Sequence, residues 1–157
     1  VAPFTAPCAN GAVGTFSCSR VAWGLPNSLR VDVLGTRGRA SWDLARCGEI
    51  KIDDVNSPAG LGGARRVLVN PDFPYFAKGS SMAFGGVGLT QIEQFTYQAH
   101  AFLQQIAGVT PEQGALPPCA SFADGYREML LADAVARSAA AGGAAVDVAD
   151  LPELASL

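Results

Sequence analysis

The sequence has little charge, one histidine and no long hydrophobic run. Charged residues make up 16% of its 157 residues, and the net charge of -3 gives no electrostatic footprint for nucleic acid. A single histidine, and four cysteines without C-x-x-C spacing, give no basis for a zinc site. No stretch approaches ~18 consecutive apolar residues, so we expect no membrane span.

Signals for secretion are also missing. The N-terminus has neither the basic segment nor the apolar core of a signal peptide. If the chain is a piece of a longer protein, this absence says nothing about the whole protein. We interpret the four cysteines as free, mostly buried thiols in a reducing cytoplasm. Cys8 and Cys18 flank a short reversal and could be cross-strand neighbours, although nothing in the sequence requires a bridge.

Strand-like alternation dominates the first half of the chain. One run at 11–21 and a second at 29–34 place alternate residues on opposite faces. The second run ends in the tight-turn sequence Gly-Thr-Arg-Gly at 35–38, and a short third run through Trp42 follows. Short connections between such runs predict antiparallel neighbours. Further strands are predicted at 49–53, 65–69 and 146–148.

Two helices are predicted in the second half. Thr90 and Glu93 can form a capping box, and the helix that they start ends at Gly108. Its apolar stripe should cover one face of the sheet: Ile92, Phe95, Ala99, Phe102, Leu103 and Ile106. A second helix begins near Ser121, with Asp124 in its first turn. We therefore predict an α+β fold in which two main helices pack on one face of a mostly antiparallel, open-faced sheet.

The composition predicts that the open face is covered by something else. Hydrophobic residues make up 49% of the chain, and the mean hydropathy is +0.22, which is apolar for a monomer of this size. Since no membrane span accounts for this excess, we assign it to an interface with another domain or another subunit.

A series of weak motifs, taken in order, resembles one protein family. The pattern N-G-A-x-G-T-x-x-x-S-R-x-A-x-G spans residues 10–24, and G-T-x-G and W-D-L follow it at 35–38 and 42–44. N-P-D-F-P-Y occurs at 70–75, and F-A-D-G-Y-R at 122–127 is followed by D-A-V and a serine. Together they resemble the C-terminal domain of the Gfo/Idh/MocA family, which contains NAD(P)-dependent oxidoreductases of sugars, inositol and related compounds.

The resemblance implies a fold and a role. The fold would be that of the C-terminal domains of dihydrodipicolinate reductase and glyceraldehyde-3-phosphate dehydrogenase. In the family, such a domain forms the floor of the substrate site, and its open sheet packs against a second subunit in a homo-oligomer, a dimer or tetramer. Residues 1–157 would then be a single domain, and NAD or NADP would bind to an N-terminal Rossmann domain that is absent from this chain.

Cofactor and catalytic motifs have no counterpart in the sequence. Gly85-Gly86-Val87-Gly88 lacks the third glycine of G-x-G-x-x-G and follows no β-branched strand, so we interpret it as a loop. The family's Lys-Pro and Asp-x-x-x-His motifs are also missing. His100, near Glu93 and Gln104, is interpreted as structural or solvated. We expect no catalytic, cofactor-binding or metal-binding residue in this chain.

Three residues are candidates for substrate binding. Arg20 and Trp23 lie at the far end of the first long strand. There a guanidinium can bond sugar or polyol hydroxyls, and an indole can cover a C–H face. The alternatives are an ion pair for Arg20 and core packing for Trp23. Tyr75 is the third candidate, because it lies in a long irregular segment, and such segments are usually functional or mobile.

Two functions remain open at this point. The chain could be the substrate-binding and oligomerisation domain of an NAD(P)-dependent oxidoreductase that acts on a sugar, inositol or related polyol. It could instead be a non-enzymatic module that keeps the fold for sheet-mediated interaction or dimerisation. A Rossmann domain encoded upstream in the same reading frame would decide for the first.

Overall fold

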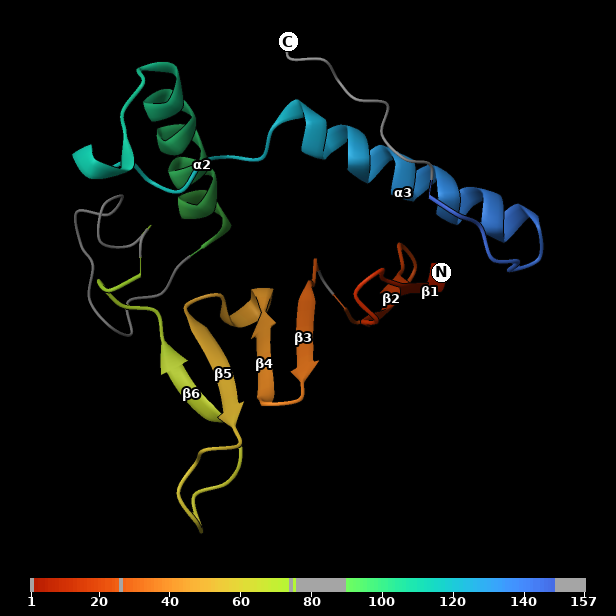
Figure 1. Cartoon of the computed structure of the whole chain (residues 1–157), viewed down its shortest axis with the longest axis horizontal. Helices are drawn as coiled ribbons and strands as arrows, with labels where there is room; N and C mark the ends of the chain where they lie inside the picture. Colours follow the sequence, from red (N-terminus) through yellow and green to blue (C-terminus); the bar gives the residue numbers. More distant parts are fainter. Residues whose placement is uncertain (1, 26, 74, 76–89, 149–157) are drawn as a thin grey trace. The chain divides into compact units, whose positions relative to one another are not determined.

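The computed structural model describes residues 2–25, 27–73, 75 and 90–148, and the strand pairings within them are antiparallel (Figure 1). The chain forms two compact units. The first unit consists of residues 1–24 and 120–157, and the second of residues 25–119. Helices and antiparallel sheets in these units confirm the predicted α+β class.

A two-stranded hairpin lies at the start of the first unit. Strand β1 (Ala2–Pro7) pairs with β2 (Val13–Cys18), and the stacked rings of Phe4 and Phe16 lie 4.7 Å apart on facing positions. The alternation predicted β2 but not β1, whose six residues include two prolines. Proline is tolerated on an edge strand because its missing N–H can face away from the partner.

The predicted proximity of Cys8 and Cys18 is wrong. The register pairs Ala2 with Cys18 and Pro7 with Val13, so the two cysteines belong to opposite ends of the hairpin. Cys8 lies in the turn, where its N–H donates to the Ala12 carbonyl at 2.8 Å. Both thiols are exposed and free, which also contradicts the expectation of burial for this pair.

Helix α3 (Phe122–Ala140) begins and ends as its sequence predicts. At its start, the Ser121 hydroxyl accepts from the Asp124 N–H at 3.2 Å, and the Asp124 carboxylate accepts from the Ser121 N–H at 2.9 Å. At its end, Gly143 has a φ of 89° and its N–H donates to the Ser138 carbonyl at 2.8 Å. The strand predicted at 146–148 is wrong, since this stretch is irregular and has no strand beside it in the described residues.

A four-stranded meander forms most of the second unit. Strands β3 (Arg30–Gly35), β4 (Gly38–Asp43), β5 (Glu49–Asp54) and β6 (Arg65–Leu68) pair in chain order. The short 3-10 helix η1 (Leu44–Arg46) joins β4 to β5, and the Asp43 carboxylate caps it by accepting from the Ala45 N–H at 2.9 Å. The indole N–H of Trp42 donates to the Cys47 carbonyl at 3.3 Å.

The register divides this sheet into an apolar face and a polar face, because successive side chains alternate and paired residues share a side. The apolar face carries Val31, Val33, Ala40, Trp42, Ile50, Ile52 and Val67, and also Arg65 in the edge strand β6. The face that we call the polar face carries Arg30, Asp32, Leu34, Arg39, Ser41, Asp43, Glu49, Lys51, Asp53 and Arg66. Two leucines lie on this face: Leu68, which pairs with Glu49, and Leu34, which is 79% exposed.

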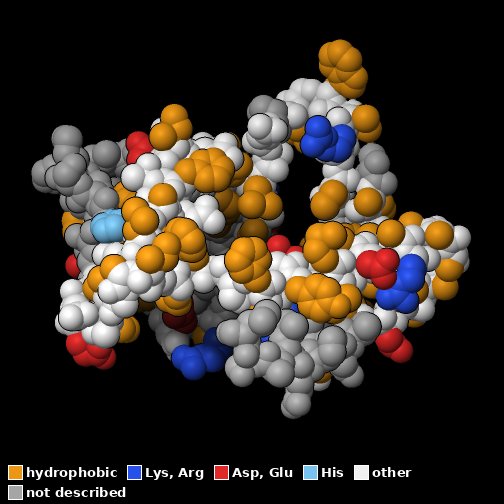
Figure 2. All heavy atoms as spheres, turned by 90° about the horizontal axis from the view of Figure 1, so that it is seen from above, with side chains coloured by type: hydrophobic (Ala, Val, Ile, Leu, Met, Phe, Trp, Pro, Cys, Tyr) orange, Lys and Arg blue, Asp and Glu red, His pale blue; other side chains and the backbone are white. Residues whose placement is uncertain are grey.

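Helix α2 (Gln91–Ile106) packs against the segment that follows it. Its predicted capping box of Thr90 and Glu93 is confirmed. Tyr97 and Ala101 are its buried residues, and Leu116 is also buried. The stripe that was expected to cover the sheet is exposed instead: Ile92, Phe95, Ala99, Phe102, Leu103 and Ile106. Such apolar side chains are visible across the described surface in Figure 2.

Side-chain amides hold this returning segment. Gln104 accepts from the Leu116 N–H at 2.8 Å, and Gln105 accepts from the Cys119 N–H at 3.1 Å. Along the chain, the 3-10 helix η2 (Pro111–Gln113) lies between α2 and these two donors. Gly114 follows η2 and turns the chain with a φ of 90°. The buried side of α2 therefore faces its own C-terminal extension.

Candidate functional site

Arg20 and Trp23 both lie on an exposed bend that follows β2. The Ser19 hydroxyl accepts from the Val21 N–H at 3.2 Å, and Gly24 adopts a φ of 79°, so local bonds shape this bend. The Trp23 side chain is fully exposed, at 101%, which contradicts core packing of the indole. Arg20 is exposed and makes no ion pair with the described residues. Both side chains are thus available to a ligand.

Tyr75 belongs to the second unit and already has partners there. Its hydroxyl donates to the Pro117 carbonyl at 3.1 Å, and its ring lies 6.3 Å from that of buried Tyr97. These contacts tie Tyr75 to α2 and to the segment after η2. The residue is 37% exposed, and a hydroxyl that donates can still accept through its oxygen lone pairs.

His100 has a structural bond to Gln104, one of the neighbours proposed for it. The Gln104 carbonyl oxygen accepts from the Leu116 N–H, so the Gln104 amide NH₂ is the group that lies 3.2 Å from His100 Nε2. An NH₂ group only donates, so His100 Nε2 accepts and its proton is on Nδ1. The geometry therefore supports the structural interpretation of this histidine over a catalytic one.

Ion pairs cover much of the polar face. Asp32 pairs with Arg30 at 2.9 Å and with Arg39 at 2.5 Å. The hydrogen bond from Arg39 is the main reason that the pKa of Asp32 lies below its usual value, and the positive charges of both guanidiniums add to the effect. Glu49 pairs with Arg46 at 2.6 Å and with Arg66 at 3.5 Å.

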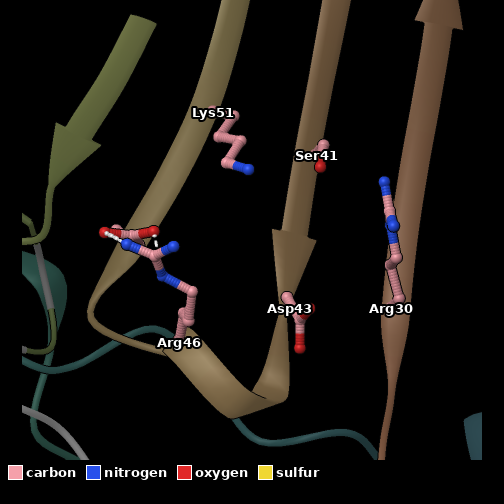
Figure 3. A pocket seen from close by; sticks show the side chains of 6 residues that line it. Arg30, Ser41, Asp43, Arg46 and Lys51 are labelled. Atoms are coloured by element: carbon pink, nitrogen blue, oxygen red, sulfur yellow. Dashed lines mark hydrogen bonds and ion pairs between the residues drawn. The ribbon is translucent and has the colours of Figure 1, made fainter. Parts of the chain in front are cut away.

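A small cavity opens on the polar face beside η1 (Figure 3). Its volume is about 70 Å³, and its lining consists of Arg30, Ser41, Asp43, Arg46, Glu49 and Lys51. Three strands and η1 supply these residues. The lining is wholly polar, with three cations, two carboxylates and one hydroxyl, so the cavity suits a charged or strongly hydrogen-bonding group.

The described residues do not form a dinucleotide cradle. Such a cradle needs a glycine-rich turn between a strand of a parallel sheet and the free N-terminus of a helix. Here the strand pairings are antiparallel, and Glu93 and Thr90 occupy the N-terminal N–H groups of α2. The glycine cluster at 85–88 lies outside the described residues.

Metal-ligand clusters and membrane-spanning helices are both missing from the described part of the chain. Nowhere in it do three or more His, Cys, Asp or Glu side chains gather as a metal ion would require. None of its helices combines the length and the apolarity needed to cross a membrane.

Comparison with known proteins points to one group of enzymes. No family model matches the chain. Levoglucosan dehydrogenase from Pseudarthrobacter phenanthrenivorans is 34% identical over 133 residues, which are 84% of this chain and 32% of the dehydrogenase. A solved structure of levoglucosan dehydrogenase in complex with NADH and levoglucosan matches 94% of the chain and 38% of its own length, with 32% identity and a TM-score of 0.80.

The chain is homologous to one domain of levoglucosan dehydrogenase. The matching part is the C-terminal domain, with open antiparallel sheets and two helices. The chain therefore spans about a third of the length of the proteins it matches. An oxidoreductase domain protein from Kribbella flavida is also similar, with 28% identity over 88% of this chain and a TM-score of 0.75. These relatives are Gfo/Idh/MocA-like, as the motifs indicated.

The cavity on the polar face was missed by sequence reasoning. Alternation in Arg30-Val31-Asp32-Val33 and in Glu49-Ile50-Lys51-Ile52 shows that each strand has a charged side. It does not show which charged residues become neighbours, because that depends on the pairing of β3, β4 and β5. Hairpin lengths fix that pairing only once the strand ends are known.

Proposed function

We propose that this chain is the substrate-binding and oligomerisation domain of an NAD(P)-dependent oxidoreductase that acts on a sugar, inositol or related polyol. The observation that carries the proposal is 34% identity to levoglucosan dehydrogenase across 84% of the chain. Structures of that enzyme hold NADH with levoglucosan and NADH with L-sorbose. A match over about a third of the enzyme's length is what one domain of a longer protein would give.

Arg20 and Trp23 are the residues that we assign to the substrate. A polyol presents hydroxyls at its rim and C–H groups on its faces. An exposed guanidinium without an ion pair in the described residues can donate to two hydroxyls, and an exposed indole can pack on the C–H face. Tyr75 is a separate candidate within the second unit, because its oxygen can accept from a hydroxyl while it donates to Pro117.

The polar face is the surface that we assign to self-association. It interleaves both signs of charge, so a copy rotated by a two-fold axis can place acids opposite bases. Leu34 lies exposed among these charges, where burial against a second copy would remove it from water. The oligomer would be a dimer or a tetramer.

The cofactor belongs, in this proposal, to another part of the protein. The described residues do not fit a dinucleotide, so NAD or NADP would bind to an N-terminal Rossmann domain. That domain would also supply the general acid and base. This chain would then contribute the substrate floor and the subunit contact, and no proton transfer of its own.

The proposal is tested with two proteins, the 157-residue chain and the full-length protein that contains it. We expect the full-length protein to reduce NAD⁺ or NADP⁺ in the presence of levoglucosan, L-sorbose, glucose or inositol, measured by absorbance of the reduced nicotinamide. We expect the 157-residue chain to leave NADH fluorescence unchanged. Tight NADH binding by the short chain would contradict the division of labour. A full-length protein with no Rossmann domain and no turnover would favour the non-enzymatic interaction module.

A further inference from the structure

The cavity on the polar face has more positive charge than its own carboxylates neutralise. Arg46 is matched by Glu49 at 2.6 Å. Asp32 neutralises Arg30 only in part, because the same carboxylate also pairs with Arg39. Lys51 is exposed and makes no ion pair with any described residue. A long cationic side chain over a polar cavity, without a counter-ion, is a candidate ligand for an anion.

The donors converge from neighbouring strands. Ser41 and Lys51 are direct cross-strand partners, so their Cβ atoms lie about 4.5–5.5 Å apart, and Arg30 is diagonal to Ser41 on the next strand. In Figure 3 the side chains of Lys51, Ser41 and Arg30 lie next to one another on three neighbouring strands, and Asp43 lies further along the strand that carries Ser41. Three donors on one wall can be shared by the oxygens of a single oxyanion.

The volume of the cavity and the second carboxylate oxygen of Asp43 indicate which anion would fit. The cavity has a volume of about 70 Å³, and one water molecule needs about 10–15 Å³ by the same measure. The cavity therefore has room for roughly the four oxygens of a phosphate. One oxygen of Asp43 accepts from Ala45, and the other can accept from a P–OH group. A simple carboxylate ligand has no such proton to donate at neutral pH.

We propose that this cavity is a binding site for a phosphate group, held by Lys51, Ser41 and Arg30 on the polar face of the β3–β6 sheet. The group is either free inorganic phosphate or the phosphate of a small monoester, since both present the same oxygens. The site uses residues of the second unit alone. It lies on the polar face that we also assign to self-association, so phosphate and a second copy would compete for this face.

The test is a titration of the full chain with inorganic phosphate at constant ionic strength, followed by calorimetry and by ³¹P NMR. We expect saturable binding, and the Lys51→Met variant should weaken it by about tenfold or more, because a charge-assisted hydrogen bond is lost. Lys51→Arg should restore most of the affinity. Arg37→Gln is the control: it removes one positive charge from the β3–β4 turn, outside the cavity, and should leave the affinity within about twofold.

Titrations with two further ligands distinguish a site for free phosphate from a site for a phosphate monoester. Glycerol 3-phosphate that binds more tightly than inorganic phosphate identifies a monoester site, and the reverse order identifies a site for the free ion. Acetate that binds as tightly as phosphate would overturn the proposal. A titration signal that rises linearly without saturation would do the same, as would an Arg37→Gln variant that loses as much affinity for phosphate as Lys51→Met. Sedimentation in the same buffers, and thermal unfolding of each variant, separate phosphate binding from self-association and from misfolding.

Discussion

At the scale of single residues, the exposed bend after β2 carries two of the residues that we propose for substrate binding. Sequence reasoning identified Arg20 and Trp23 but left an ion pair and core packing as alternatives. A fully exposed indole excludes core packing, because nothing in the fold of this unit depends on it. Local sequence could not decide this, since burial depends on what the rest of the chain places over the bend.

We predict that Arg20→Ala and Trp23→Ala each raise the KM of the full-length enzyme for its sugar by about tenfold, with a smaller effect on kcat. Each removes a contact made equally with substrate and transition state, which affects KM rather than kcat. The stability should change by no more than about 0.5 kcal/mol, because both side chains are exposed. Arg37→Ala is the matched control for charge. An unchanged KM for every sugar tested would remove both residues from the site.

Gly38 gives a residue-scale prediction about stability. It opens β4 with a φ of 152°, and a Cβ there would meet the backbone carbonyl oxygen of Asp53 on the neighbouring strand. Because that atom is backbone, it cannot move away without disturbing the β4–β5 pairing.

We therefore predict that Gly38→Ala lowers the free energy of unfolding by about 2 kcal/mol or more, measured by urea denaturation. Gly62→Ala serves as the control, since a Cβ at Gly62 has nothing within 4 Å and its φ is not in the left-handed region. Equal stability of the two variants would show that the turn at 35–38 relaxes freely.

At the scale of elements, the signals that are local in sequence were reliable. Period-2 alternation located β2 to β6, and the caps at Thr90 and Ser121 located both long helices. The failures come from non-local physics. Strand β1 exists because β2 pairs with it, despite its prolines, and residues 146–148 stay irregular without such a partner in the described chain. An apolar stripe shows that a helix has an apolar side, not what that side contacts.

The capping box of α2 gives a prediction about pH. The hydrogen bond from the Thr90 hydroxyl is the main cause that lowers the pKa of Glu93 below its ordinary 4.5, and bonds from backbone N–H groups add to it. A carboxyl whose pKa is lower in the folded state stabilises the fold above its unfolded pKa, and this contribution is lost as the pH falls through the folded value.

We expect the thermal midpoint of the wild-type chain to fall between pH 5 and pH 3 more than that of Glu93→Gln, whose amide accepts the same bonds without titrating. Glu128→Gln, an exposed carboxylate on α3, should keep the wild-type pH dependence. Thr90→Ala should cost about 1 kcal/mol at pH 7, as loss of an N-cap does. Circular dichroism at 222 nm measures all four proteins. Parallel pH curves for wild type and Glu93→Gln would contradict the role of this carboxyl.

At the scale of the whole molecule, the observation behind the proposed interface is the exposure of apolar side chains. Many large apolar side chains are exposed in both units of this chain, which is 49% hydrophobic and 16% charged. The chain also covers only about a third of its relatives. The residues that we propose for the interface and for phosphate binding could not be predicted from composition, because both sets depend on the register of the β3–β6 sheet.

Leu34 provides the test of self-association. It is 79% exposed on the polar face, whereas Leu61 is 67% exposed in the loop between β5 and β6. If the polar face pairs with a second copy, Leu34→Asp places an unpaired carboxylate in the contact and should weaken association by about tenfold or more. Leu61→Asp adds the same charge outside that face and should leave association unchanged. Sedimentation velocity of the full-length protein over a concentration series measures both, and circular dichroism checks that each variant is folded. Because both leucines are exposed, neither change should disturb the fold, so identical sedimentation of Leu34→Asp and wild type would assign the subunit contact to another surface.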